Sequence, residues 1–350
     1  MWMLSVRELR YRLRRVLLAV AVVAVVFGIA VAVDGIKRTI RTEPQQLTDI
    51  LGVDGWIVAG SNRSPFATMS VLPEETADTV AAIPGVRSVH PVVAGRTTVA
   101  SPERVNTNLI GFDAGPDRPD WLHVTAGRMP RTDREVVATA NLGVEPGTTL
   151  ETTAGKLVVV GITERGTYFA GAPTLFTTVR GAQQAVVAGT PYVMGIGYVG
   201  RVASPPAGTS IGTNADTVSD MRLTLDNAST TIDFLALLTW LVAAGVIGAI
   251  TYLSVVEQTR NFAILRATGS PARLIVGSLV IQSMSVSVSA ALLAVPFAFL
   301  LRLGMPMHST ITFGSVVQIV VVGIVVGVVA SLAAARRAIT VDPALAFGGA

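Results

Sequence analysis

Four stretches of the chain are apolar over the length that a membrane-spanning helix requires. A helix that crosses a hydrocarbon core of about 30 Å needs about 20 apolar residues. The pattern therefore predicts spans at residues 16–34, 231–256, 274–301 and 313–335. The first span follows a basic segment, as the core of a signal peptide does. Its apolar run is long for a signal peptide and no small-x-small cleavage site follows, so we expect an uncleaved anchor.

The long segment between the first two spans, residues 35–230, has the pattern of a folded domain. Short runs rich in β-branched and aromatic residues alternate with turn signals such as Pro84-Gly85 and Pro146-Gly147, which is typical of strands. The predicted strands lie within residues 55–60, 105–112, 156–162 and 192–200. Helices are predicted at 73–83, 178–187 and 216–225, the first with Pro73 in its opening turn. We therefore expect an α+β domain large enough to bury its own core.

The arginines predict how the spans are oriented. They gather before the first span, between the second and third, and after the fourth, three places that share one side of a four-span topology. Basic residues favour the cytoplasmic side, so residues 1–15, 257–273 and 336–350 are expected in the cytoplasm and residues 35–230 and the short loop 302–312 outside. Lys37, Arg38 and Arg41 disagree, but long translocated domains tolerate such charge. The expected location is the inner membrane of a bacterium, with several spans.

Composition supports the membrane assignment. Only 14% of the 350 residues are charged and 51% are hydrophobic, whereas soluble domains carry about 25% charged residues. The net charge of +4 comes from arginines beside apolar runs, and no nucleic-acid-reading motif accompanies them, so we expect no nucleic-acid partner. The chain has no cysteine, which excludes disulfides and thiolate chemistry.

The loop between the second and third spans has the pattern of a short cytoplasmic helix. Glu257 and Arg260 are spaced for an i,i+3 ion pair, and three apolar residues form one side. These apolar residues are Phe262, Ile264 and Leu265. Gly269 suits the end of this helix, and Ser270 followed by Pro271 suits the start of the next. An amphipathic helix that lies in the lipid headgroups fits the same pattern equally well.

This loop resembles the E-x-T-R-E-I-G-I-L-R-A-x-G-A segment of FtsX/MacB-type ABC transporter permeases. The matching residues are Glu257, Thr259, Arg260, Ile264, Leu265, Arg266, Ala267 and Gly269. Asn261, Phe262, Ala263 and Ser270 depart from the commonest choices. The opening of the chain also resembles that of these permeases, as do its last residues and residues 134–162, so the resemblance extends over most of the chain.

The resemblance implies a permease subunit with four transmembrane helices and a MacB-like core domain outside the membrane. In that family the loop is the coupling helix that enters a groove of the ATPase. The expected ATPase-coupling residues are Glu257, Thr259, Arg260, Phe262, Ile264, Leu265, Arg266 and Gly269. Two ABC ATPase subunits, a second permease copy, membrane lipids and an external accessory protein are the partners that the resemblance implies. ATP and magnesium would bind to the ATPase, and this chain would bind no cofactor or metal itself.

The sequence offers little for catalysis or for ion transport. No P-loop occurs, so the ATPase is expected on a separate chain. Residues 208–212 match G-x-S-x-G, but Ser210 follows a turn-like run instead of the strand that a nucleophile elbow needs. His90, His123 and His308 are scattered, without metal-ligand spacing. The spans lack the buried charges of proton or ion pathways, so no solute path through them is expected.

Two groups of residues leave alternatives open. Five aromatic residues of the external domain are candidates for surface contacts, although core packing is favoured for each: Trp56, Phe66, Trp121, Tyr168 and Phe169. The small residues of the third and fourth spans, including Gly323 and Gly327, favour close helix packing, and a dimer seam is the sharper alternative. For the whole chain, export or extraction of a substrate is favoured. An FtsX-like regulator of cell-wall hydrolases and a structural or sensory protein without an ATPase are the alternatives.

Overall fold

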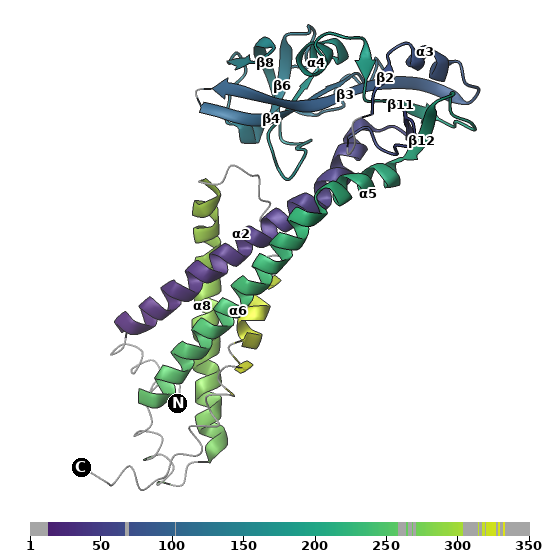
Figure 1. Cartoon of the computed structure of the whole chain (residues 1–350). Helices are drawn as coiled ribbons and strands as arrows, with labels where there is room; N and C mark the ends of the chain where they lie inside the picture. Colours follow the sequence, from purple (N-terminus) through teal and green to yellow (C-terminus); the bar gives the residue numbers. More distant parts are fainter. Residues whose placement is uncertain are drawn as a thin grey trace. The chain divides into compact units, whose positions relative to one another are not determined.

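A computed structural model describes residues 13–66, 70–101, 103–257, 264, 268, 271–303, 314, 317–318, 320–326, 328–329 and 332. These residues divide into two compact units (Figure 1). The sheet unit comprises Ile36–Thr230, and the helical unit comprises described residues on both sides of it. The helix α2, Leu13–Leu51, is continuous and contributes residues to both units.

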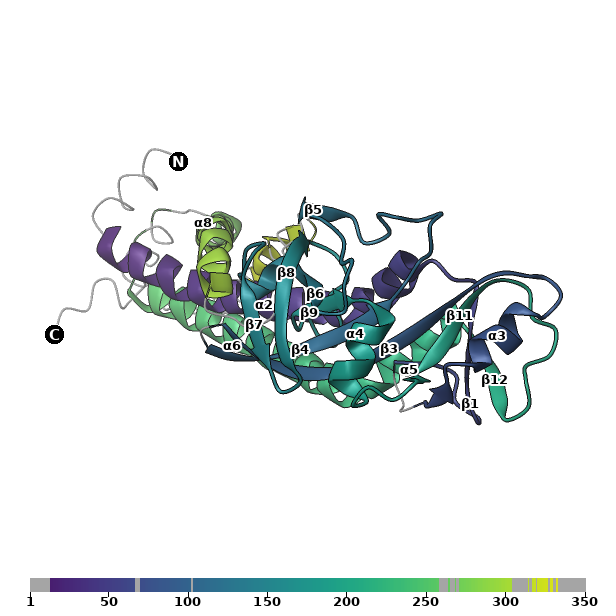
Figure 2. The ribbon, with the colours of Figure 1, turned by 90° about the horizontal axis from the view of Figure 1, so that it is seen from above.

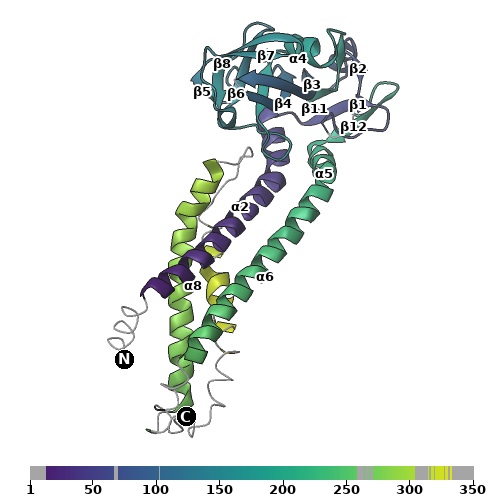
Figure 3. The ribbon, with the colours of Figure 1, turned by 60° about the vertical axis from the view of Figure 1, so that its left-hand side comes forward.

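Three long helices run through the helical unit: α2, α6 (Asp226–Glu257) and α8 (Ala272–Leu303) (Figure 3). Within the described residues, two helical segments are long and apolar enough to cross a membrane, Val20–Leu51 and Ala228–Ile250. The predicted third span lies on α8, in which the apolar stretch is shorter. The fourth predicted span is described only in part, so the total of four spans stays a prediction.

The helical unit is packed through small residues. Phe27 of α2 is buried among alanines of α8, and Ala243 and Ile247 of α6 join the same apolar cluster. A Cβ atom added to Gly323 would lie 2.9 Å from the ring of Phe27, so only glycine allows this approach without displacement. The expected close packing therefore holds at Gly323, whereas Gly327 lies outside the described residues.

Among the described residues of the sheet unit, ten strands form one mixed sheet (Figure 2). The strand order is β12-β1-β11-β3-β4-β9-β6-β8-β5, with β7 paired to β3 and β8. Its strands are β1 (Gly55–Ala59), β3 (Val86–Ser101), β4 (Glu103–Phe112), β5 (Val124–Gly127), β6 (Glu135–Thr139), β7 (Thr149–Thr152), β8 (Gly155–Thr163), β9 (Thr174–Thr177), β11 (Gly195–Gly200) and β12 (Thr209–Thr213). A separate pair joins β2 (Leu72–Pro73) to β10 (Tyr192–Val193). This is the α+β fold that the pattern predicted.

Each face of the sheet carries its own apolar core because side chains alternate along a strand. Ile57 lies in one core, and its neighbours Trp56 and Val58 lie in the other. Helices α3 (Thr76–Ala81) and α4 (Val179–Val186) cover the Ile57 face, where α4 lies against β3 and β4. The end of α2 and the helix α5 (Asn214–Thr224) cover the Trp56 face. A 3₁₀ turn spans Ala140–Leu142.

Several helix starts differ from the sequence prediction. Pro73 does not open a helix, because it pairs with Tyr192 in a two-residue strand and α3 begins only at Thr76. Such a short edge strand tolerates the missing N–H of proline. The third helix begins at Asn214, two residues earlier than predicted, because Thr213 caps it. Similarly, α8 begins at Ala272, so Pro271 precedes its first turn.

Candidate coupling site

The structure describes part of the predicted coupling segment. Glu257 is the last residue of α6 and is exposed. Ile264 is helical and 47% exposed, and its carbonyl oxygen accepts a hydrogen bond from the amide of Thr268 at 3.0 Å. This spacing is that of an α-helical turn. The remaining predicted coupling residues lie outside the described residues: Thr259, Arg260, Phe262, Leu265, Arg266 and Gly269. The ATPase contact of this segment therefore stays a prediction.

The end of α2 is fastened to the sheet unit by one arginine. The guanidinium of Arg118 donates to the carbonyl oxygens of Leu51 and Ile50 at 2.6 and 2.7 Å. The last carbonyls of a helix have no partner within it, and a cation there is favoured by the helix dipole. Gly52 then ends the helix with a left-handed φ of 63°, and its amide donates to Thr48. A Cβ atom on Gly52 would collide with Arg118. The sequence did not predict this contact, which we call the Arg118 clamp, because Arg118 is far along the chain from Ile50 and Leu51.

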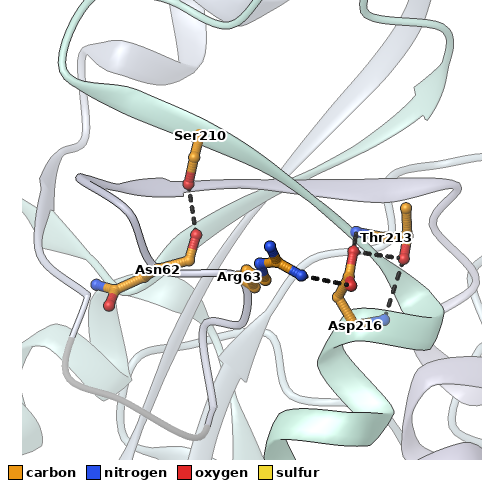
Figure 4. Close-up of polar contacts among 5 residues, drawn as sticks. All are labelled: Asn62, Arg63, Ser210, Thr213 and Asp216. Atoms are coloured by element: carbon orange, nitrogen blue, oxygen red, sulfur yellow. Dashed lines mark hydrogen bonds and ion pairs between the residues drawn. The ribbon is translucent and has the colours of Figure 1, made fainter.

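The start of α5 is fastened by a capping box (Figure 4). The hydroxyl of Thr213 accepts from the amide of Asp216 at 3.0 Å, and the carboxylate of Asp216 accepts from the amide of Thr213 at 3.0 Å. These bonds lower the pKa of Asp216. The guanidinium of Arg63, 3.5 Å from the Asp216 carboxylate, lowers it further. Such reciprocal bonds satisfy two otherwise unpaired amides. The T-x-x-D spacing was the signal in the sequence that could have placed this helix start.

Further contacts join α5 to β1 and to α2. The indole N–H of Trp56 donates to the side-chain oxygen of Asn214 at 3.0 Å, and the Asn214 amide group donates to Val53. Arg222 donates to the carbonyl oxygen of Arg41 at 3.0 Å. Two helices whose other ends lead into predicted spans are thus fixed to one face of the sheet.

Three of the five candidate aromatic residues belong to the core, as favoured. Trp56, Phe66 and Trp121 are 0%, 9% and 6% exposed and make edge-to-face contacts with neighbouring rings. The rings of Trp56 and Phe66 lie 5.6 Å apart, and those of Phe66 and Tyr168 lie 5.8 Å apart. Tyr168 and Phe169 are half-buried. These rings stabilise the Trp56 face of the sheet.

The G-x-S-x-G match does not form a nucleophile elbow. Ser210 lies within β12, and its hydroxyl donates to the backbone carbonyl oxygen of Asn62 (Figure 4). An elbow instead places the serine on a tight turn between a strand and a helix, beside a base. The hydroxyl of Ser210 therefore fixes the backbone at Asn62 against β12.

The histidines of the sheet unit do not form a ligand cluster. His90 is buried, and its two ring nitrogens pair with the Ser88 hydroxyl and the Asp113 carbonyl oxygen, each at 2.8 Å. A backbone carbonyl cannot supply the negative charge that steadies a catalytic imidazolium, so these bonds satisfy a buried polar side chain. Within the described residues, no three His, Asp or Glu side chains come together to hold a metal ion.

Comparison with known proteins identifies the family. Residues 234–343 match the family described as FtsX-like permease C-terminal. An ABC transporter permease of Mycobacterium bovis is 32% identical over 345 residues, which covers 99% of both chains. An ABC transporter permease of Mycobacterium tuberculosis H37Rv is 32% identical over 346 residues, again over 99% of each. This chain belongs to the FtsX-like ABC transporter permeases. Members of this family are embedded in the membrane.

Two solved structures are similar to part of this permease. The extracellular domain of the noncanonic ABC-type transporter YknZ from Gram-positive bacteria matches 51% of this chain and 95% of that one, with 17% identity and a TM-score of 0.34. The periplasmic region of MacB from Actinobacillus actinomycetemcomitans matches 52% of this chain and 98% of that one, with 15% identity and a TM-score of 0.35.

Proposed function

We propose that this permease couples ATP hydrolysis by a separate ABC ATPase to a conformational change of the sheet unit outside the membrane. Two ATPase subunits would engage a permease dimer through the cytoplasmic loop 257–273. Movement of the spans would then pass along α2 and through α6 into α5. The resulting change in the sheet unit would drive export or extraction of a substrate.

The observation that supports this proposal is that two helix ends, the end of α2 and the start of α5, are both fixed to the same sheet. Arg118 holds the end of α2, while the Thr213–Asp216 box and Asn214 hold the start of α5. Both attachments lie on the Trp56 face of the sheet. A shift of α2 relative to α5 would therefore displace side chains of the one apolar core on that face. The family supplies the energy source, because ABC permeases work with ATPases, and no P-loop occurs in the sequence of this chain.

The test is co-purification of a co-expressed ABC ATPase from the same genome with the permease in nanodiscs. The double change Phe262→Asp and Leu265→Asp places two charges on the apolar side of the predicted coupling helix. We expect the wild type to retain the ATPase and this variant to lose it, because burying unpaired carboxylates in a protein groove is costly.

The matched control places two carboxylates elsewhere. Val158 and Tyr192 are 37% and 41% exposed in the sheet unit, so Val158→Asp with Tyr192→Asp should leave ATPase binding unchanged. If the ATPase binds the loop variant as well as the wild type, the loop is not the coupling element. If the ATPase binds neither the wild type nor the variants, the proposal that this permease works with an ABC ATPase is wrong.

A further inference from the structure

Glu43 is a buried carboxylate on α2 that the attachments above do not use. Its side chain is 3% exposed. One oxygen, Oε1, accepts from the backbone amide of Gly171 at 2.7 Å. The other, Oε2, is buried without a hydrogen-bond partner. Burying a carboxylate with an unpaired oxygen is costly, so this residue needs an explanation other than stability.

The partner of Glu43 is a turn with strained backbone. Phe169, Ala170 and Gly171 have consecutive φ values of 65°, 61° and 75°. Residues with a Cβ atom rarely adopt such values, which are typical of functional constraint. Consecutive amides in turns of this kind can line a concave site for an anion. The carboxylate of Glu43 occupies that position at Gly171.

Several side chains of the sheet unit hold this turn in place. The guanidinium of Arg96 lies 3.8 Å from the centre of the Phe169 ring, which favours a cation–π contact. The Tyr168 hydroxyl donates to the carbonyl oxygen of Phe66 at 2.6 Å. The side-chain amide of Asn141 donates to the carbonyl oxygen of Gly171 at 2.8 Å. These contacts anchor the turn to the sheet, whereas Glu43 reaches it from the part of α2 that lies in the same unit.

Next to Glu43, α2 has a weak point. Pro44 lies inside the helix, where proline removes one backbone hydrogen bond and clashes with the preceding turn. Bends in long helices concentrate at such residues. The hydroxyl of Thr48 donates to the carbonyl oxygen of Pro44 at 3.1 Å and so bridges the following turn. Bending of α2 at Pro44 would move Glu43 relative to residues 169–171.

The hollow beside Glu43 is too small for a small-molecule ligand. Its volume is about 10 Å³, close to the ~10–15 Å³ that one water molecule needs. The other lining residues are Pro44, Tyr168, Phe169, Met221, Thr224 and Leu225. They come from α2, from the strained turn, and from α5 and the residue that follows it.

Because the carboxylate of Glu43 is buried, its contact with the Gly171 amide can be broken at a low cost. Burial raises the pKa of Glu43, and the Thr167 hydroxyl and the amides of Gly171 and Ala170 oppose this shift without cancelling it. The ionised carboxylate is thus less favourable in this site than in water.

We propose that Glu43 is a coupling residue that docks α2 onto the 169–171 turn and releases it during the ATP-driven cycle. The proposal rests on the function proposed above. The Glu43 contact and the strained turn together form a two-state element. Glu43 is docked on the turn when α2 is straight at Pro44, and it is released when α2 bends there. Arg118 stays bound to the end of α2 in both positions, so that movement is confined to the Glu43 region.

The test is hydrogen exchange of the amides of residues 166–172 in the full permease with its co-purified ATPase. Samples without nucleotide are compared with samples trapped by ATP and vanadate. In the wild type we expect exchange to change about 10- to 150-fold between the two states, as for loss of one charge-assisted hydrogen bond. Glu43→Ala should exchange fast in both states. Glu43→Gln keeps an acceptor for Gly171 and removes the charge, so it should exchange slowly in both.

The control is Asp49→Ala, which removes an exposed carboxylate from the same helix and should behave as the wild type. The proposal fails if the wild-type turn exchanges equally in both states while ATPase is bound, or if Glu43→Ala matches the wild type. Absence of the ATPase from the purified samples would instead refute the proposed function. In that case the nucleotide-free samples still decide whether Glu43 holds the turn.

Discussion

Two glutamates of the sheet unit show how neighbouring groups set the properties of a carboxylate. Glu135 receives two parallel bonds from the Arg128 guanidinium at 2.8 and 2.6 Å and one from the Arg131 amide at 2.8 Å. These donors lower the pKa of Glu135 to about 2, with Arg128 the largest cause. Glu43 has no cation against it among its hydrogen-bond partners, and its burial raises its pKa. One carboxylate is therefore stabilised as an anion and the other is not.

The two residues should respond to pH with opposite signs. A raised folded pKa means that Glu43 supports folding fully below its unfolded pKa, near 4.5, and loses that support as pH rises through the folded value. Glu43→Gln should therefore melt at or above the wild-type temperature at pH 7, and this advantage should shrink as pH falls toward 4.5. Thermal unfolding in detergent, followed by tryptophan fluorescence from pH 7 to 4, measures the difference.

Glu135→Gln provides the matched control. Because the folded pKa of Glu135 is depressed to about 2, its contribution is present above the unfolded pKa and is lost as pH falls toward 2. This variant should melt below the wild type at pH 7, and the deficit should narrow only under acid conditions. Equal pH dependence of the two differences would contradict the assigned environments.

At the scale of elements, the ends of helices decide how the sheet unit is held. The end of α2 depends on Arg118, whose side chain replaces hydrogen bonds that the helix cannot make itself. We expect Arg118→Met to destabilise the protein by about 1–3 kcal/mol, as for loss of hydrogen bonds to a charged donor. Arg87→Met is the control, since Arg87 is 75% exposed and pairs with Asp54 at 3.7 Å. That change should cost at most about 1 kcal/mol. Equal melting temperatures of the two variants would show that the clamp is not stabilising.

The element scale also shows which parts of the fold could be read from the sequence. Strands such as β1, β4 and β8 were predicted because β-branched residues and turn signals mark them. The continuation of α2 to Leu51 was not, since charged residues and Pro44 follow the apolar run and imitate the start of a domain. The strand β9 is only four residues long and fully buried, which is too short for a periodic signal. Glu43 could not be foreseen either, because its partner Gly171 is remote in sequence.

At the scale of the whole molecule, the coupling proposal requires the sheet unit and the 257–273 loop to lie on opposite sides of the membrane. The pattern of arginines predicts this topology, and the family match shows only that the chain is membrane-embedded. Because the chain has no cysteine, single introduced cysteines report their own location without background. This makes the topology directly measurable in intact cells.

Glu145 is exposed in the sheet unit, so Glu145→Cys should react in intact cells with a maleimide that cannot cross the membrane. Thr259→Cys, in the predicted coupling loop, should react only after the cells are permeabilised, and so should Ala338→Cys in the predicted cytoplasmic tail. Labelling of Thr259→Cys in intact cells would place the loop out of reach of any cytoplasmic ATPase. Labelling of Thr259→Cys but not Ala338→Cys would mean that an odd number of spans separates them, which would also refute the four-span prediction. Only the expected pattern, with the sheet unit alone accessible, leaves α2 and α6 able to carry the effect of ATP hydrolysis outward.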